Sequence, residues 1–324
     1  MSNNNFKKGL LFGILVGLAW GLDTVLMGKL GGLSLFKEAK STPLVQAFFH
    51  DGFCFIWLAL ILALTKSLKP LFKLMKSKKG KVTIMAALVG APLGMSGYLL
   101  GVKYASAPYA SSISVIYPGI GALLSYFILK EKLSFRAVVG IALSIIGSAM
   151  LGYSKVDLNL YPQFYLGIGF SLLAVFGWAL EGVIIGFAMK KIKTKEDDES
   201  IKPIHYLSLR YLTSFVVYGF IVLPLVKGYP LAIEVIKSGT FVYLAGIATL
   251  GVTTYLSWYK AVDLIGAAMG TALNSTAAFW AVVFSGLFGM KITFYLAFWC
   301  MVIVLGVMIF AIDPKEFKKN KQTA

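Results

Sequence analysis

Five ionisable side chains of this chain lie inside long apolar stretches, and their types are those that handle charge or protons. They are Asp23, His50, Asp51, Glu181 and Arg210. One charge at the centre of a bilayer costs about 2.5–3.5 kcal/mol on insertion scales, so such groups pair with one another or face a water-filled cavity. They therefore mark a candidate solute or proton pathway, and pairing that only fixes helix packing is the alternative reading.

Two of these acids follow a tryptophan at the same spacing. Asp23 stands three residues after Trp20, and Glu181 stands three residues after Trp178. Residues three apart share one face of a helix. A ring face beside a carboxylate can hold a cation, or it can stack on and hydrogen-bond a polar heterocycle. We expect all four residues to contact a solute.

Other polar and aromatic residues near the ends of apolar stretches could complete such a site. The candidates are Tyr98, Tyr117, Tyr255, Trp258 and Asn274. His50 and Asp51 are candidates for proton coupling because histidine changes its charge near neutral pH, although a buried His–carboxylate pair is often only structural. The sequence has no Cys/His spacing of a metal site, so we expect neither a metal nor a cofactor.

The composition indicates which elements position these residues. Of 324 residues, 58% are hydrophobic and 14% are charged, and the mean hydropathy is +0.79. The apolar stretches are about 20 residues long, which is the length of a helix across a hydrocarbon layer of about 30 Å. Alternation with period two is absent, which favours helices over a barrel. We predict an all-α integral membrane protein with about ten transmembrane helices, at 9–28, 44–64, 82–102, 108–129, 135–153, 163–189, 205–226, 239–259, 264–288 and 293–312.

The net charge of +17 lies mainly in the short loops between these spans. With the N-terminus inside, 23 of the 31 basic residues fall on the inner side. Loops rich in Lys and Arg stay in the cytoplasm. We therefore expect a multi-pass protein of a bacterial-type cytoplasmic (inner) membrane with both termini cytoplasmic. Its expected partners are membrane lipids and a small-molecule solute, with no nucleic acid.

The sequence repeats itself. The Trp–acid pairs recur at an offset of 158 residues, Pro43 and Pro203 at 160, and Tyr98 and Tyr255 at 157. Five spans per half is an odd number, so the second copy enters the membrane inverted, as in carriers that alternate access to a midplane site. The predicted units are a first five-helix repeat at 1–156, an inverted second repeat at 157–313 and a cytoplasmic basic tail at 314–324.

Three motifs close the first half and carry a family resemblance. They are Lys103-Tyr-Ala-Ser-Ala-Pro-Tyr-Ala-Ser, Tyr117-Pro118 and Leu129-Lys-Glu131-Lys-Leu133. With them the chain resembles the EamA-type drug/metabolite transporter superfamily over essentially its whole length. The resemblance implies ten helices, a cavity between the halves and solute movement without ATP. The second half departs from the pattern, since Ala277 or Ala278 replaces the proline and Met290 replaces the glutamate.

These observations predict a secondary transporter of a small organic metabolite, acting by alternating access, and not an enzyme. The abundance of aromatic residues fits a flat polar vitamin, and the superfamily has a bacterial riboflavin-uptake branch, so riboflavin uptake is the favoured prediction. Export of aromatic amino acids or drugs and uptake of a choline-like cation are the alternatives. An integral-membrane enzyme is the competing class. We expect a monomer or a homodimer.

Overall fold

The regular structure of this protein is entirely helical in the part described. The computed structural model describes residues 3–37, 39–129, 134–153, 156–191, 200–265, 270 and 273–311, and no strand occurs among them. Seven helical stretches are long and apolar enough to cross a membrane, and three shorter apolar helices lie in the remaining predicted spans. The predicted all-α membrane fold class is confirmed.

The first half supplies the helices up to α9. They are α1 (Asn3–Gly31), α2 (Ser34–Lys37), α3 (Thr42–Leu64), α4 (Leu68–Lys76), α5 (Lys78–Leu88), the π-helical turn η1 (Val89–Leu93), α6 (Gly94–Ala105), α7 (Ala107–Ser114), α8 (Tyr117–Leu129) and α9 (Phe135–Gly152). The motif residue Glu131 lies outside the described residues.

The second half supplies the remaining helices. It contains α10 (Phe164–Lys191), α11 (Pro203–Val217), the π-helical turn η2 (Tyr218–Val222), α12 (Leu223–Leu225), α13 (Tyr229–Lys237), α14 (Phe241–Ile265), α16 (Ala277–Leu287) and α17 (Phe294–Ala311). Part of the predicted span 264–288 and the whole basic tail 314–324 lie outside the described residues.

Prolines mark the starts and irregular points of these helices. Pro43 and Pro203 both stand in the first turn, of α3 and α11 respectively, where the missing N–H is harmless. Pro92 lies inside η1. A proline within a helix removes a backbone hydrogen bond and loosens the turn, which accounts for the π-helical geometry at this point. The predicted span 108–129 is interrupted at Val115 and Ile116, just before Pro118. It therefore consists of two helices, α7 followed by α8.

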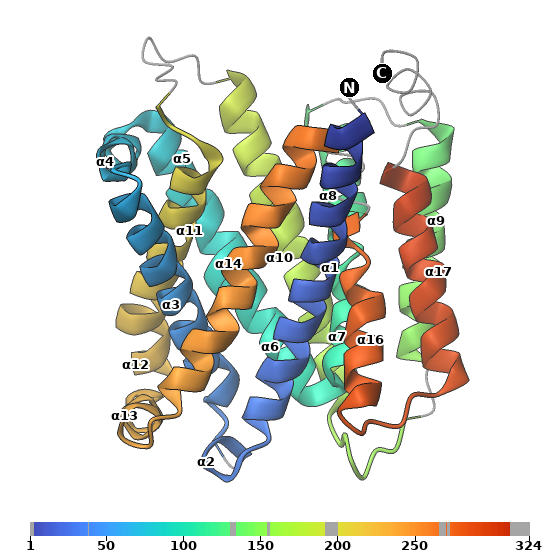
Figure 1. Ribbon diagram of the computed structural model, residues 1–324. Coiled ribbons are helices and arrows are strands. Elements are labelled where there is room, and N and C mark those ends of the chain that lie inside the picture. Colours follow the sequence, from blue (N-terminus) through green and yellow to red (C-terminus); the bar gives the residue numbers. More distant parts are fainter. Residues whose placement is uncertain are drawn as a thin grey trace.

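The helices stand side by side, with both chain ends at the same end of the bundle (Figure 1). α1 packs along α14 and α16, and α9 packs with α17 at one side. The glycine stripe Gly9, Gly13, Gly17 and Gly21 lies on the α14–α16 side of α1, where added Cβ atoms would overlap Ile265, Leu273, Thr276 and Trp280. Small residues at this spacing let two membrane helices approach closely.

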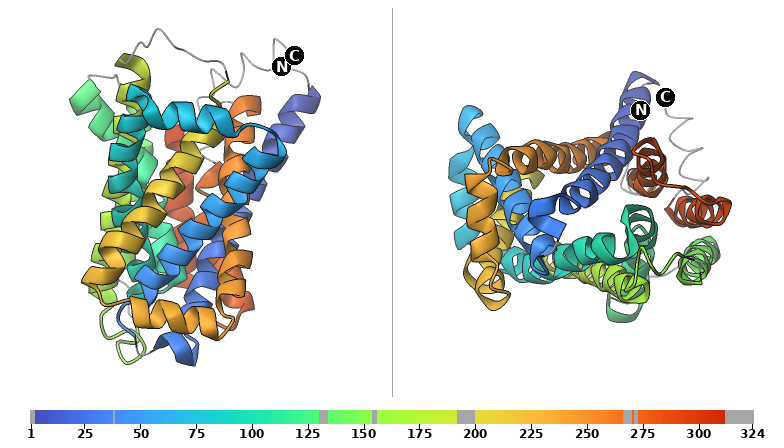
Figure 2. Two further views of the ribbon diagram at one scale, coloured as in Figure 1. Left: turned by 90° about the vertical axis from the view of Figure 1, so that its left-hand side faces the viewer. Right: turned by 90° about the horizontal axis from the view of Figure 1, so that it is seen from below.

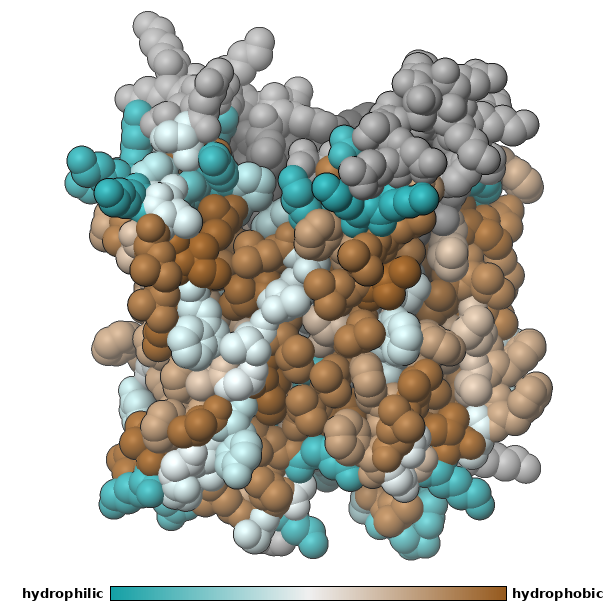
Figure 3. Space-filling view, viewed as in Figure 1, coloured by the Kyte–Doolittle hydropathy of each residue, from teal (hydrophilic) through white to brown (hydrophobic). Residues whose placement is uncertain are grey.

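The surface has the layering of a membrane protein. A band of apolar side chains surrounds the middle of the visible face, and hydrophilic side chains lie at its two ends (Figure 3). Two short helices, α4 and α13, run across the bundle at opposite ends rather than along it (Figure 2). α4 lies at the end with both termini, and α13 lies at the other.

Candidate functional site

A cavity of about 740 Å³ lies among α1, α3, α6, α10, α11 and α14. All eleven residues that the sequence put forward for solute or proton handling line it: Trp20, Asp23, His50, Asp51, Tyr98, Tyr117, Trp178, Glu181, Tyr255, Trp258 and Asn274. The lining also reaches Lys79 at the start of α5 and exposed Pro203 at the start of α11. The cavity therefore extends to the surface at the end of the bundle that holds both termini.

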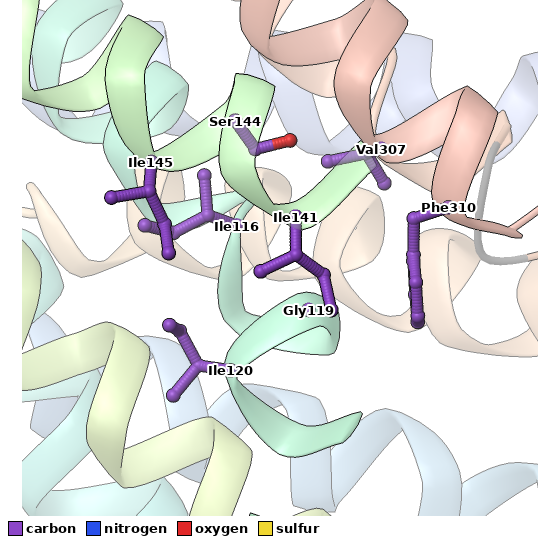
Figure 4. Close-up of a pocket in the computed structure, with 8 residues that line it drawn as sticks. All are labelled: Ile116, Gly119, Ile120, Ile141, Ser144, Ile145, Val307 and Phe310. Atoms are coloured by element: carbon purple, nitrogen blue, oxygen red, sulfur yellow. The ribbon is translucent and has the colours of Figure 1, made fainter. Parts of the chain in front are cut away.

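A second crevice, between α8, α9 and α17, does not have the properties of a binding site. Isoleucines provide half of its lining residues, and no water-sized molecule fits inside it (Figure 4). Its one hydroxyl, that of Ser144, already donates to the carbonyl oxygen of Gly140 at 2.9 Å. This crevice belongs to the packing of the α9–α17 pair.

One corner of the cavity is a buried ion pair between α10 and α11. Arg210 donates through Nε to Glu181 Oε1 at 2.7 Å and through Nη2 to Oε2 at 3.2 Å. Only 8% of Glu181 and 9% of Arg210 are exposed. A bidentate Arg–carboxylate pair is among the strongest hydrogen-bonded arrangements. Both carboxylate oxygens of Glu181 are thus occupied by this chain's own guanidinium.

The same arginine is held from three further directions. Its guanidinium carbon lies 5.5 Å from the ring centre of Tyr211 and 5.6 Å from that of Tyr255. Its Nη2 also approaches the carbonyl oxygen of Gly90, in η1, at 3.4 Å. A Cβ at Gly90 would overlap the Glu181 carboxylate, so a glycine is required for this approach. Arg210 does not extend to the membrane surface, and it ties α11 to both α10 and η1.

A second corner of the cavity joins α1, α3 and α11 through a histidine between two carboxylates. His50 Nε2 lies 3.2 Å from Asp23 Oδ2, and His50 Nδ1 lies 3.0 Å from Asp51 Oδ1. Ser214 donates to the other oxygen of Asp51 at 2.5 Å. Exposed fractions are 6% for Asp23, 3% for His50 and 1% for Asp51. This group of three, Asp23–His50–Asp51, is called the histidine triad below.

The histidine triad must hold an extra proton in this arrangement. An ionised carboxylate only accepts hydrogen bonds, and a neutral imidazole has one donor and one acceptor nitrogen. Because both nitrogens of His50 face carboxylate oxygens, either the imidazole is doubly protonated or one carboxyl carries a proton. The triad then has a net charge of −1, and it would have −2 after losing that proton. It is chemically able to store and release one proton.

Four aromatic rings also gather in the lining of the cavity. The Trp178 ring centre lies 5.7 Å from that of Trp20, 5.2 Å from that of Tyr98 and 5.8 Å from that of Tyr117. The Tyr98 hydroxyl is hydrogen-bonded to Thr24, one residue after Asp23. In the part of the chain that the structure describes, no Lys or Arg lies over these four rings, whereas Tyr211 and Tyr255 hold Arg210.

Tyr117 and Asn274 connect the two halves at the helix interruptions. They stand 157 residues apart, close to the repeat offset, and the Asn274 amide nitrogen lies 3.5 Å from the Tyr117 hydroxyl. The carbonyl oxygen of the Asn274 side chain has no hydrogen-bond partner among the described residues. A polar acceptor of this kind at a cavity wall suits a solute with a hydroxyl or amine donor.

Sequence reasoning missed several residues of the site. Ser214 attracts no notice by its type, yet it lies one helical turn after Arg210, and this spacing could have placed it on the same face. Tyr211 was equally detectable as the neighbour of Arg210, one of the five ionisable candidates. The role of Gly90 had no sequence signal, because it depends on how closely α5 and η1 approach α10.

A large cavity that is open at one end of the bundle and lined by both halves of an all-helical membrane protein fits a membrane transporter of small solutes. The chain belongs to the EamA-like transporter family, whose model matches residues 7–153 and again residues 165–312. The family predicted from the three sequence motifs is thus confirmed, whereas the riboflavin branch gains no support.

Relatives from distant organisms agree with this assignment. The chain is 29% identical to Protein LicB of Haemophilus influenzae over 279 residues, which is 85% of this chain and 87% of that protein. It is 32% identical to a WAT1-related protein of Arabidopsis thaliana over 38% of this chain and 37% of that one. A solved crystal structure shares the fold with a TM-score of 0.51 and 14% identity, over 98% of this chain and 99% of that one.

Proposed function

We propose that this transporter moves a small organic cation, of the size and type of choline, by alternating access of its two inverted repeats. The observation that carries the proposal is the ring cluster of Trp20, Tyr98 and Trp178 beside the Asp23 carboxylate. Aromatic faces together with a carboxylate are the recurrent means by which proteins bind quaternary ammonium groups.

The charges of the cavity wall favour a cation over a neutral solute. Asp23, Asp51 and Glu181 provide three carboxylates, Arg210 neutralises one of them, and the other cation of the lining, Lys79, stands at the cavity mouth at the start of α5. Even with the extra proton, the histidine triad retains one negative charge. An uncompensated charge in a low-dielectric site is costly, so a cationic solute beside Asp23 would stabilise both partners.

The two groups of rings support the same conclusion. Tyr211 and Tyr255 are already occupied by the Arg210 guanidinium at cation–π distance. The Trp20–Tyr98–Trp178 cluster is lined up around the same cavity with no Lys or Arg over it in the described part of the chain. We infer that the solute supplies the cation for this second cluster.

Riboflavin and aromatic amino acids are the competing solutes. Riboflavin would stack on the rings but is uncharged, so it leaves the negative charge of the triad uncompensated. An aromatic amino acid brings a carboxylate as well as an ammonium group. Arg210 is poorly matched to that carboxylate, because its charge is already balanced by Glu181, to which its Nε and Nη2 donate. The charge balance therefore ranks both below an organic cation.

We further propose that His50 and Asp51 carry the coupling proton. The triad is built around one shared proton, and solute binding at Asp23 would compete with His50 for the same carboxylate.

We also propose, on the basis of the loop lysines, that both termini lie in the cytoplasm of a bacterial-type membrane. The cavity is then open to the cytoplasm in the present state. The repeat boundaries at 156 and 313 and a monomeric or homodimeric state belong to the same proposal.

Counterflow in proteoliposomes tests the solute assignment. Vesicles containing the purified protein and loaded with unlabelled choline, riboflavin or tryptophan receive the same compound in labelled form outside. We expect exchange of choline, inhibited by other quaternary ammonium compounds. The uncharged carbon analogue of choline, in which carbon replaces nitrogen, provides the matched control because it has the same shape without the charge.

The outcomes separate the alternatives. Inhibition by the carbon analogue as strong as that by choline would show that shape and not charge is recognised. Exchange of riboflavin without exchange of choline would restore the vitamin hypothesis. If none of the three exchanges and a lipid substrate is turned over instead, the protein is an integral-membrane enzyme.

A further inference from the structure

Lysines are concentrated at one end of the bundle, and of these only Lys79 lines the cavity. Between Leu64 and Thr83 the chain carries seven lysines: Lys66, Lys69, Lys73, Lys76, Lys78, Lys79 and Lys81. No Asp or Glu occurs anywhere between Asp51 and Glu131. All of the seven except Lys79 are exposed. This segment includes α4 and the first turn of α5.

The helix α4 is amphipathic and lies at the level of the membrane surface. Leu71 and Leu74 are buried, in a cluster with Leu62 and Leu209. Lys69 and Lys76 stand on the opposite, exposed face, and Phe72 beside them is 59% exposed. The helix runs across the bundle at one of its ends (Figure 2). A lysine face combined with an exposed aromatic ring is typical of a helix that lies in the headgroup region.

The second repeat offers an internal comparison. α13 occupies the equivalent place between α11 and α14, and it also runs across the bundle, at the opposite end (Figure 2). Both helices carry a proline in the first turn, Pro70 and Pro230. Yet α13 contains one glutamate and one lysine, where α4 contains three lysines and no acid. The fold therefore needs a crosswise helix at this position but does not need it to be basic.

We propose that the surface formed by α4 and the start of α5, called the lysine surface below, binds the headgroups of anionic phospholipids. Clusters of four to eight Lys or Arg on an amphipathic helix next to a transmembrane helix have this property. A basic loop that only fixes topology needs no amphipathic helix and no exposed ring, and α4 has both. The lysine surface is also coupled to the transport pathway, since Leu74 packs with Leu209, next to Arg210, and Lys79 lines the cavity mouth.

The test compares two variants with the same change in charge. Lys69→Gln/Lys76→Gln/Lys78→Gln removes three charges from the lysine surface. Lys40→Gln/Lys227→Gln/Lys237→Gln removes three exposed lysines from loops and helices elsewhere, including the counterpart helix α13. Wild type and both variants are placed in nanodiscs of phosphatidylcholine alone and of phosphatidylcholine with phosphatidylglycerol, and the midpoint of thermal unfolding is measured in each.

We expect phosphatidylglycerol to raise the midpoint of wild type and of the control variant, and to have little effect on the lysine-surface variant. High salt should abolish the rise in wild type, because exposed charges are screened within about 8 Å at physiological ionic strength and more closely above it. In phosphatidylcholine alone, the three proteins should unfold alike. If the lysine-surface variant is too unstable to prepare, the single variants Lys69→Gln and Lys40→Gln are compared in the same way.

Three results would overturn the proposal. The rise could persist in the lysine-surface variant, it could be lost equally in the control variant, or inorganic phosphate in phosphatidylcholine nanodiscs could reproduce it. The last outcome would identify a general anion site rather than a lipid surface. None of these measurements uses transport, so the proposal stands or falls independently of the solute.

Discussion

The two charged corners of the cavity occupy equivalent places in the two repeats and differ in chemistry. Asp23 and Glu181 correspond at an offset of 158, and His50 and Arg210 at an offset of 160. In each repeat the acid of the first helix contacts the base of the second. Arginine stays protonated in proteins, whereas histidine changes its charge near neutral pH. One corner therefore has a fixed charge balance, and the other has a variable one.

This difference assigns different tasks to the corners. The Glu181–Arg210 pair is neutral, bidentate and enclosed by Tyr211 and Tyr255. We interpret it as the structural corner, which holds α10 against α11. The histidine triad has an excess of carboxylates and lies beside unoccupied rings. We interpret it as the working corner, where solute and proton are handled.

The largest effect is expected from breaking the structural corner. Arg210→Gln leaves the Glu181 carboxylate buried without a cation, which destabilises a protein by about 3–5 kcal/mol. The midpoint of thermal unfolding in detergent should fall markedly. The double variant Glu181→Gln/Arg210→Gln should recover most of the loss, because no charge is then left unpaired. An Arg210→Gln protein that unfolds like wild type would show that this pair does not hold α10 to α11.

The second effect concerns the carboxylate of the working corner. Asp23→Asn removes the charge but retains an oxygen and a nitrogen for His50, so the fold should be preserved. We expect the affinity for a choline-like cation to fall roughly 30- to 100-fold, which corresponds to about 2–3 kcal/mol for one charge-assisted contact. Equilibrium binding of labelled choline measures it. Asp157→Asn, at the surface between α9 and α10, is the matched control.

A smaller effect is expected from the rings. Trp20→Leu removes an aromatic face from the cluster, and a cation–π contact contributes roughly 1–2 kcal/mol, or about 5- to 30-fold in affinity. Trp20→Phe should retain much of the binding because a ring remains. Trp57→Leu, whose indole donates to the Ala245 carbonyl oxygen outside the cavity, should leave the affinity of the folded protein unchanged. Equal binding by Trp20→Leu and Trp20→Phe would mean that size and not the ring face matters.

How much of this the sequence could predict depends on the kind of residue. Polar residues are conspicuous in apolar helices, so every candidate from Trp20 to Asn274 was identifiable, and all lie at one cavity. The repeat also indicated which acid and base correspond. What the sequence could not supply were contacts between elements: the donation from Ser214 to Asp51 and the close approach at Gly90 depend on helix packing.

The smallest and most diagnostic effect is a pH dependence confined to the working corner. The charged and titratable groups that face His50 are Asp23, Asp51 and, at 3.9 Å, the Cys54 thiol. Adding a proton to the triad reduces its negative charge, so a cation should bind more weakly as the pH falls and more tightly as it rises. As the pH rises from 6 to 9 we expect a several-fold gain in the choline affinity of wild type, because the triad then gives up its proton. In His50→Gln the carboxylates lose the imidazole that takes up this proton, so the pH profile should become much flatter.

The equivalent change at the structural corner provides the control for this prediction. The double variant Glu181→Gln/Arg210→Gln removes one acid and one base together and leaves His50 in place, so its choline affinity should follow pH as wild type does. A pH profile that survives His50→Gln but disappears in the Glu181→Gln/Arg210→Gln protein would reverse the assignment of the two corners. The proton would then be handled in the second repeat, and the histidine triad would be the part that only fixes helix packing.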